Sequence, residues 1–316
     1  MTSKHFLILF AFAAAFLFNP AHARMEREIS ETFTVEPGGL ASLSTQGGDI
    51  IIDTGETDEV HIVARLVFPR ADSDAEVDEI MAELDLTMES TDDGVAVSSK
   101  RPSSTSSWFG WGKRNSVSVH LHATVPVDYN IDARTSGGDI EVANLNGEVS
   151  ARTSGGNIAV GHINGSVDVS TSGGDISVNH AVGRVKAHTS GGNVRVDDAE
   201  GPVHASTSGG DVHIGRVVGE LRATTSGGDI YARIEGPLEA NALLSTSGGD
   251  VTAHVDDVIG FDLDARTSGG NVKAPGITIK IDSGGLGKSR LAGAVNGGGP
   301  TLKLRTSGGD VRVKTS

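Results

Sequence analysis

The chain has 316 residues, a formal net charge of −15, no cysteine and 43 glycines, and aromatic residues make up only 4% of it. Glycine does not recur at every third position, which excludes a collagen-like triple helix. The lack of cysteine excludes a disulfide framework, and the acidic charge argues against nucleic acid or anionic lipid as a partner. The composition therefore predicts a protein that is stabilised by packing and backbone hydrogen bonds.

Residues 1–23 have the pattern of a secretory signal peptide. Lys4 provides a positive charge, Phe6–Phe18 is an apolar run, and Ala21-His22-Ala23 matches a small-residue cleavage site. The run is shorter than the roughly 20 residues that a membrane-spanning helix needs. Cleavage is therefore predicted instead of membrane anchoring, and the mature protein is expected in the periplasm or outside the cell.

Residues 24–130 show little periodicity and are predicted to form a β-rich cap on the open end of the repeat region that follows. Strands are expected at Val60–Phe68 and Val117–Val125, and a hairpin over Leu86–Ser99 turns at Asp92-Asp93-Gly94. One short helix is expected over residues 72–84, capped by Asp72 or Ser73, with an apolar face made by Val77, Ile80, Met81 and Leu84.

Both tryptophans of the chain lie in a Ser- and Gly-rich loop, residues 101–114. The candidates for partner contact in this loop are Trp108, Phe109, Trp111, Lys113 and Arg114. An exposed aromatic cluster beside cations fits a membrane interface, a glycan or a partner protein. The alternative is a loop that folds its aromatic side chains back over the cap, and the sequence does not separate the two.

A repeat of 18 to 21 residues dominates residues 131–316. Thr-Ser-Gly-Gly begins at Thr135, Thr153, Thr171, Thr189, Thr207, Thr225, Thr246, Thr267 and Thr306, and a related motif begins at Thr45. Each repeat holds two short alternating segments bounded by glycine turns, which is a strand pattern. The last interval of 39 residues is expected to contain a degenerate coil around Ser283-Gly284-Gly285.

Alignment of the repeats produces apolar columns that become buried only if successive coils stack. One column is Ile140, Ile158, Ile176, Val194, Val212 and Ile230, and another is Val149, Val167, Val185, Val203 and Leu221. The predicted fold is an all-β, parallel β-helix-like solenoid of about ten coils, narrow and flattened, with the N-terminal cap and its one helix.

The repeats also lead to expectations for the outward-facing residues and for the carboxy-terminal coil. One outward column (Glu141, Ala159, Ser177, Arg195, His213, Tyr231) mixes charges, so no ligand-binding stripe is expected on it. The last coil ends at Asp310–Ser316 and is expected at the open edge of the stack. Arg312 and Lys314 are expected to protect that edge against pairing with another chain.

The position after each Gly-Gly is always Asp or Asn. It is Asp at 139, 175, 211, 229, 250 and 310, and Asn at 157, 193 and 271. Stacked calcium ligands are one interpretation. The other is turn chemistry, in which glycine supplies positive φ and Asp or Asn bonds nearby backbone. Turn chemistry is favoured, because Asn serves a turn but offers no anionic ligand. The Thr of the motif is predicted to point inward and to cap backbone groups.

Four histidines are weak candidates for a transition-metal site. His120 and His122 share one face of a strand, and His162 and His180 fall at equivalent positions of consecutive coils, followed by Asp198. Solvated surface histidines are favoured instead, and no cofactor is expected. A polysaccharide-cleaving enzyme would need paired carboxylates in a groove built by loop insertions. Coils this short leave little room for a groove, so the protein is not expected to be an enzyme.

The Gly47-Gly48-Asp49-Ile50 motif, the Val125-Pro126 junction and the nine later repeats resemble the bacterial putative-adhesin family of unknown function. Its members are exported or membrane-anchored proteins with Thr-Ser-Gly-Asp-Val/Ile repeats. The resemblance covers most of the mature chain and implies the solenoid fold, with no catalytic or ligand residues to transfer.

Together these features predict a non-enzymatic module of the cell envelope, adhesin-like or a scaffold. It is expected to be a monomer that contacts an envelope protein or a glycan, and to meet a membrane only through loop 101–114. The alternative is a calcium- or zinc-binding envelope module, and a polysaccharide-active β-helix enzyme comes third.

Overall fold

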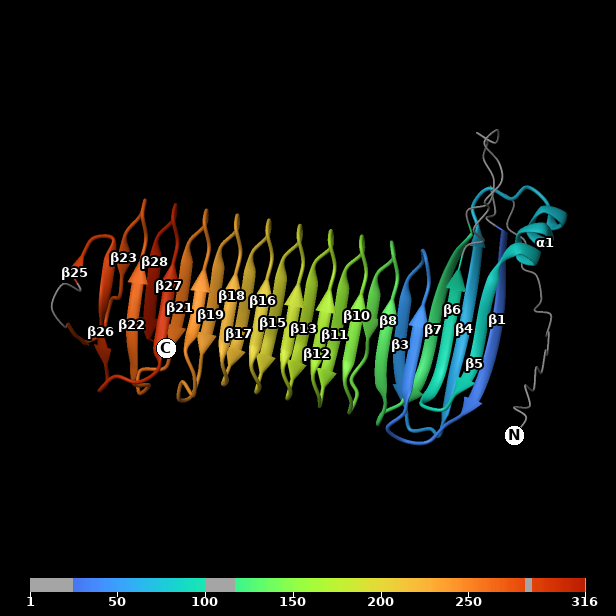
Figure 1. Cartoon of the computed structure of the whole chain (residues 1–316), viewed down its shortest axis with the longest axis horizontal. Helices are drawn as coiled ribbons and strands as arrows, with labels where there is room; N and C mark the ends of the chain where they lie inside the picture. The colour runs from blue at the N-terminus through green and yellow to red at the C-terminus, as the bar shows by residue number, and fades with distance from the viewer. Residues whose placement is uncertain (1–24, 101–116, 282–285, 316) are drawn as a thin grey trace.

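Alternating apolar residues form short strands throughout the computed structural model, which describes residues 25–100, 117–281 and 286–315. The strands make two long sheets that face each other across one apolar core, and together they form an elongated, flattened rod (Figure 1). Each repeat coil adds one strand to each sheet, so the predicted all-β solenoid is confirmed. The predicted signal peptide and the loop with Trp108 and Trp111 lie outside the described residues.

The first sheet has 13 strands. In spatial order they are β1 (Met25–Thr34), β4 (Glu59–Phe68), β7 (Ser118–Pro126), β3 (Ile50–Gly55), β9 (Ile140–Val142), β11 (Ile158–Ile163), β13 (Ile176–Ala181), β15 (Val194–Ala199), β17 (Val212–Val217), β19 (Ile230–Ile234), β21 (Val251–Val255), β28 (Val311–Thr315) and β23 (Val272–Lys273).

The second sheet has 15 strands. In the opposite direction along the rod they are β24 (Ile279–Lys280), β26 (Arg290–Val295), β22 (Phe261–Arg266), β27 (Thr301–Arg305), β20 (Ala242–Ser245), β18 (Leu221–Thr224), β16 (Val203–Ser206), β14 (Val185–His188), β12 (Val167–Ser170), β10 (Val149–Arg152), β8 (Asn130–Arg134), β2 (Leu40–Ser44), β6 (Gly94–Lys100) and β5 (Asp85–Thr91). A short β25 (Leu286–Gly287) pairs with β26.

Parallel, in-register pairing places equivalent residues of successive repeats on top of one another. Ile158 pairs with Ile176, and Val149 pairs with Val167, and all four side chains are buried. A column of small residues, Ala151, Ala187, Ala205 and Ala223, is buried in the second sheet. Small inward side chains let the two sheets approach closely, which explains why the rod is flattened.

The sequence predicts that the parallel stack begins at residue 131. In the structure it begins upstream of that residue. Strand β2 pairs in parallel with β8 and β6, and β3 pairs in parallel with β9 and β7. Two coils of the solenoid therefore come from residues 24–130. Beyond them, β4 and β1 extend the first sheet in antiparallel fashion, and β5 does the same for the second sheet. These three strands close this end of the rod.

The single helix in the described part of the chain, α1 (Asp74–Glu83), connects β4 to β5. Ser73 is its N-cap, since its hydroxyl accepts the Glu76 N–H at 3.3 Å. Val77 and Ile80 are buried. The predicted helix and its apolar face are thereby confirmed.

The carboxy-terminal coil lies inside the stack, so the expected open edge at Asp310–Ser316 is wrong. Strand β27 pairs with β20 on one side and with β22 on the other, and β28 pairs with β21 and β23. Residues Phe261–Lys273 precede this coil in sequence but lie outside it in space. Figure 1 accordingly shows the C-terminus set back from the end of the rod.

The 39-residue interval before the last repeat contains an end cap. Within the described residues of that interval, β26 runs antiparallel to β22 and covers its outer edge, and β24 and β25 pair with β26 in the same sense. The degenerate coil is expected around Ser283-Gly284-Gly285, which lies outside the described residues. The repeat periodicity sets the register within a coil but not the order of coils in space.

Candidate functional site

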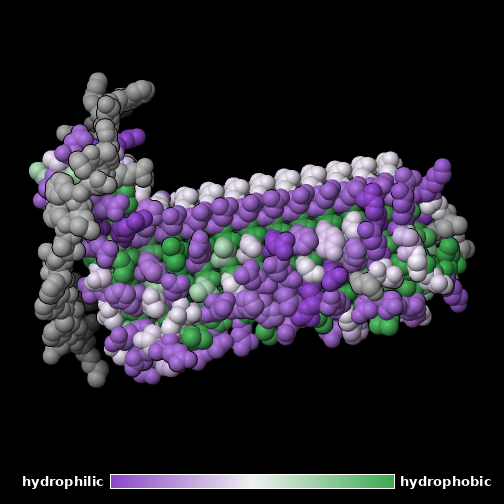
Figure 2. Space-filling view, turned by 180° about the vertical axis from the view of Figure 1, so that it is seen from behind, coloured by the Kyte–Doolittle hydropathy of each residue, from purple (hydrophilic) through white to green (hydrophobic). Residues whose placement is uncertain are grey.

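The Thr-Ser-Gly-Gly corners connect the second sheet to the first and stack along one edge of the rod. Figure 2 shows this long edge as a continuous pale row, the intermediate hydropathy of Ser, Thr and Gly. The Thr171 hydroxyl donates to the Gly156 carbonyl of the preceding coil at 2.8 Å and accepts the Gly174 N–H. The same donation is made by Thr135, Thr153, Thr189, Thr207, Thr225, Thr246, Thr267 and Thr306, all of them buried. The prediction that this Thr points inward and caps backbone is confirmed.

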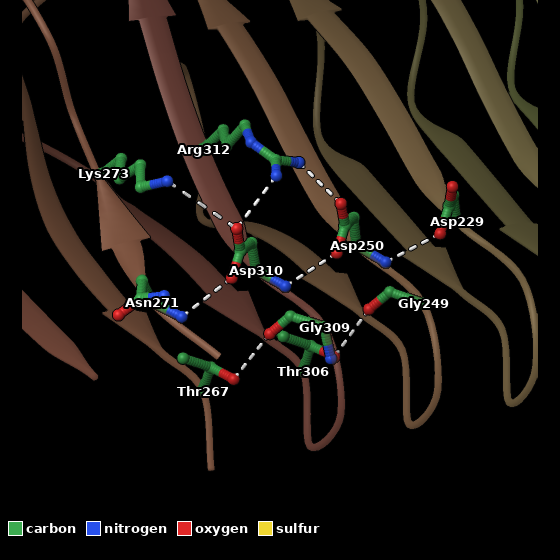
Figure 3. A network of polar contacts seen from close by, with 10 residues as sticks. All are labelled: Asp229, Gly249, Asp250, Thr267, Asn271, Lys273, Thr306, Gly309, Asp310 and Arg312. Carbon is green, nitrogen blue, oxygen red and sulfur yellow. Dashed lines mark hydrogen bonds and ion pairs between the residues drawn. The ribbon is translucent and has the colours of Figure 1, made fainter. Parts of the chain in front are cut away.

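The Asp or Asn of each corner bonds the backbone of the next coil in space. The Asp139 Oδ1 accepts the Asn157 N–H at 2.6 Å, and the Asn157 Oδ1 accepts the Asp175 N–H at 2.8 Å. We call this row of contacts the corner ladder. It continues without a break to Asp310 and Asn271 (Figure 3). Both residue types carry Oδ1, which explains why either Asp or Asn can occupy this position.

The corner ladder agrees with the predicted turn chemistry but differs from the prediction in two details. The acceptor serves the next coil, not the backbone nearby in sequence. The second glycine is required for close approach, because a Cβ on Gly174 would lie 2.1 Å from the Gly156 carbonyl oxygen. Among the ladder corners, positive φ is found at Gly48 alone. In the part of the chain that the structure describes, no group of three or more His, Asp or Glu side chains is arranged to hold a metal ion.

His120 ends the corner ladder, and His122 faces a carboxylate beside it. In the other corners, an Asp or Asn Oδ1 accepts this backbone N–H. Here the Asp49 N–H donates to the His120 Nδ1 at 3.2 Å. His122 Nε2 lies 2.8 Å from an Asp53 carboxylate oxygen. Both imidazoles project outward, as predicted from the strand pattern, and each faces one carboxylate.

His162 and His180 lie side by side on β11 and β13, with Asp198 next on β15. The two rings are 5.5 Å apart, and His180 Nδ1 lies 3.0 Å from Asp198, which also binds Arg216 at 2.7 Å. The pair borders a recess of 270 Å³ lined by Val127, Asn144, Leu145, Asn146, His162, Ile163, Asn164, His180 and Val182. Asp198 is held by Arg216, so His162, His180 and Asp198 do not form a converging ligand set.

Arg312 neutralises the end of the corner ladder where carboxylates are most crowded. Its guanidinium binds Asp250 at 2.6 Å and Asp310 at 2.9 Å, and Lys273 lies 3.9 Å from Asp310 (Figure 3). The Arg312 hydrogen bond, followed by the Asp310 N–H, lowers the pKa of Asp250 below its ordinary value. Arg312 therefore separates like charges within the stack and does not protect an edge.

The outward side chains of β19, β21 and β28 form a patch rich in rings and cations. They are Tyr231, Arg233, Thr252, His254, Arg312 and Lys314. No carboxylate occupies an outward position on these three strands, all of whose residues are described. We call these six residues the ring–cation patch. The sequence-based column missed it, because β28 comes to lie beside β21 only through the altered order of coils.

The rings of the patch continue onto β17. The His213 and Tyr231 rings are stacked at 4.7 Å with 7° between their planes, and the His254 ring lies 5.2 Å from Tyr231. Burial and then Arg195 lower the pKa of His213, while burial, then Lys314 and Arg233, lower the pKa of His254. Both imidazoles are therefore neutral at pH 7, and each keeps one donor and one acceptor nitrogen.

A comparison with protein families assigns the chain. The model of the Toastrack DUF4097 family matches residues 41–314. The chain belongs to this family. The matched range runs through both sheets, from β2 to β28. A search of curated proteins gave no match.

Solved structures similar to this Toastrack chain are described as adhesins or adhesion proteins. A putative adhesin from Bacteroides fragilis is 13% identical, with 92% of this chain and 97% of that chain covered and a TM-score of 0.37. One from Parabacteroides merdae is 9% identical, with 92% and 96% covered and a TM-score of 0.38. A putative cell adhesion protein from Clostridium sporogenes is 12% identical, with 92% and 100% covered and a TM-score of 0.20. The family that the repeat motif indicated is confirmed by the match of the family model to residues 41–314.

The described residues contain no helix long and apolar enough to cross a membrane.

Proposed function

We propose that the protein is a non-enzymatic, adhesin-like binding module of the bacterial cell envelope. The observation that carries this proposal is the in-register stacking of outward side chains over many coils, which turns short strands into continuous binding faces. The Thr hydroxyls and the Asp or Asn Oδ1 atoms of the corners are not free for this role, since they are bound to neighbouring coils. Contact with a partner therefore falls to the outward faces of the sheets and to the loop at 101–114.

The proposed localisation is the periplasm or the cell exterior, after cleavage of a signal peptide at residue 23. The apolar run Phe6–Phe18 and the Ala21-His22-Ala23 site support export. A cysteine-free fold that rests on backbone ladders also needs no redox control on either side of the inner membrane. Mass spectrometry of the protein from the envelope fraction tests this, with Arg24 expected as the first residue.

The protein is further proposed to act as a monomer. The sheets end in β1 and β5 at one end of the rod and in β23 and β24 at the other. β23 and β24 are only two residues long and β1 carries several charged side chains, and both features discourage pairing with another rod. Sedimentation over a wide concentration range is expected to give one constant monomer mass.

Co-sedimentation with bacterial envelope fragments tests the proposed function. The mature protein is expected in the pellet with the fragments and in the supernatant without them. Two double variants, Trp108→Ala/Trp111→Ala and Arg233→Gln/Lys314→Gln, show which surface is responsible. Wild-type protein that stays in the supernatant with fragments from several species contradicts the proposal.

A further inference from the structure

The ring–cation patch has a charge opposite to that of the rest of the chain. The chain carries a formal net charge of −15, yet the outward positions of β19, β21 and β28 hold Arg233, Arg312 and Lys314 and no carboxylate. Lys273, on the next strand, adds a further cation. The chain thus gathers positive charge at one place on an otherwise acidic rod.

The cations of the patch differ in how free they are. Arg312 is bound to Asp250 and Asp310, so it neutralises the corner ladder and is not available to a ligand. Arg233 has one partner, Glu235 at 3.5 Å, in an exposed pair, and exposed pairs of this kind are weak. Lys314 is exposed and forms no ion pair with any residue that the structure describes. Arg233 and Lys314 are therefore the cations that can receive an anionic group.

The rings beside these cations provide a second kind of contact. His213 and Tyr231 stack face to face, and His254 lies against the other side of Tyr231. Each of the three side chains is half-buried, so their edges reach solvent. Neutral imidazoles and hydroxyls of Tyr231 and Thr252 offer both donors and acceptors, which suits a ligand with many hydroxyl groups.

We propose that the ring–cation patch binds an acidic polysaccharide, whose carboxylates meet Arg233 and Lys314 and whose hydroxyls meet the ring edges of Tyr231, His213 and His254. This inference rests on the proposed function and names the class of partner. Strands about 4.8 Å apart give the patch, which spans three strands, a length of about two sugar-sized steps along the rod. A polymer lying along the rod axis can therefore contact successive coils.

The density of negative charge distinguishes an acidic polysaccharide from other polyanions. Nucleic acid and anionic membranes carry dense negative charge over a large area, and the acidic chain around the patch repels them. An acidic polysaccharide carries well-spaced carboxylates along a narrow chain, so a patch three strands wide is enough to hold it. Hydroxyls between the carboxylates use the neutral polar groups that a simple cation patch would lack.

Affinity electrophoresis of the full mature protein tests the proposal, with polygalacturonate as the probe and galactan as its neutral counterpart. Wild-type protein is expected to be retarded by polygalacturonate and not by galactan, and less so as salt is added. Arg233→Gln/Lys314→Gln and Tyr231→Ala are each expected to weaken the affinity about tenfold, which equals about 1.4 kcal/mol.

The matched control is Arg222→Gln/Lys303→Gln, which removes two exposed cations from the outward face of the second sheet. Its affinity is expected to stay within about twofold of wild type. Equal loss in both double variants, or no retardation of wild type, overturns the proposal. Stronger binding to phosphatidylserine vesicles or duplex DNA than to polygalacturonate overturns it as well. If wild type still co-sediments with envelope fragments in that case, the proposed function stands and only the ligand class fails.

Discussion

The two glycines of each corner look equivalent in sequence but have different surroundings. A Cβ on Gly137 would meet no atom within 4 Å, while a Cβ on Gly138 would lie 2.1 Å from the Gly48 carbonyl oxygen. The backbone of one coil presses on the second glycine of the next. The repeat therefore keeps a pair of glycines in which the second leaves no space for a side chain.

This difference predicts opposite outcomes for the same substitution at adjacent positions. Gly138→Ala is expected to lower the free energy of unfolding by about 1–3 kcal/mol, because the backbone must shift to accept the methyl group. Gly137→Ala is expected to be neutral or slightly stabilising, since it only restricts the unfolded chain. Urea unfolding followed by circular dichroism measures both, and equal destabilisation by the two variants contradicts the close-approach explanation.

The corner ladder makes a second prediction at the residue scale. Asp175→Asn keeps the Oδ1 that accepts the Asn193 N–H at 2.6 Å, so its unfolding midpoint is expected to match wild type. Asp175→Ala removes that acceptor from an exposed corner and is expected to cost about 0.5–1.5 kcal/mol. If the carboxylate served calcium, the Asn variant would instead lose stability in calcium buffer and not in EDTA.

Residue chemistry predicted these contacts only in part. The inward Thr and the exchange of Asp for Asn followed from alternation and from shared acceptor atoms. That Asp175 bonds Asn193, and not its own turn, depends on the spacing between coils, which no single repeat contains. The sequence also makes His120 a metal candidate, and its place at the end of the corner ladder is not predictable because it depends on β7 lying beside β3.

At the scale of elements, strands β21 and β28 are joined by charge as well as by backbone. Arg312 on β28 binds Asp250, which directly precedes β21, and lowers the pKa of that carboxyl. A lowered pKa in the folded state stabilises the fold above the ordinary value of 3.8, and the contribution is lost as the pH falls through the folded value. Acid therefore weakens this strand pair.

Arg312→Gln tests the link between the pair and pH. The variant is expected to have a lower urea midpoint than wild type near pH 6, and the difference is expected to shrink as the pH falls below about 3.8. Arg222→Gln is the control, because Arg222 is exposed on β18 and forms no ion pair with a described residue. A gap between wild type and Arg312→Gln that stays constant down to about pH 3 rules out the Asp250 contribution.

At the scale of the whole molecule, both ends of the rod depart from the order of the chain. The coil of β6 and β7 lies outside the coil of β2 and β3, and the coil of β22 and β23 lies outside the carboxy-terminal coil. Periodicity predicted the two sheets and the core columns. It could not predict the order at the ends, because every coil offers the same apolar columns to either neighbour.

The order of coils has a direct covalent test, and the chain is suited to it because it has no cysteine. Thr252 pairs in register with Arg312, and Arg312 pairs with Lys273, so β28 separates Thr252 from Lys273. Neighbouring strands are about 4.8 Å apart, which is within reach of a disulfide, while about 9.6 Å across two strands is too far. All three residues point outward, so cysteines there leave the core intact.

Thr252→Cys/Arg312→Cys is therefore expected to form a disulfide on mild oxidation, and Thr252→Cys/Lys273→Cys to keep two free thiols. Thiol labelling followed by mass spectrometry distinguishes the two states. A chain that stacked its coils in sequence order would give the reverse result, since β23 would then lie next to β21. In that case Arg312 and Lys314 would sit at the end of the rod, away from Tyr231 and His254, and the ring–cation patch would not exist. The disulfide pattern thus tests both the fold and the proposed binding surface.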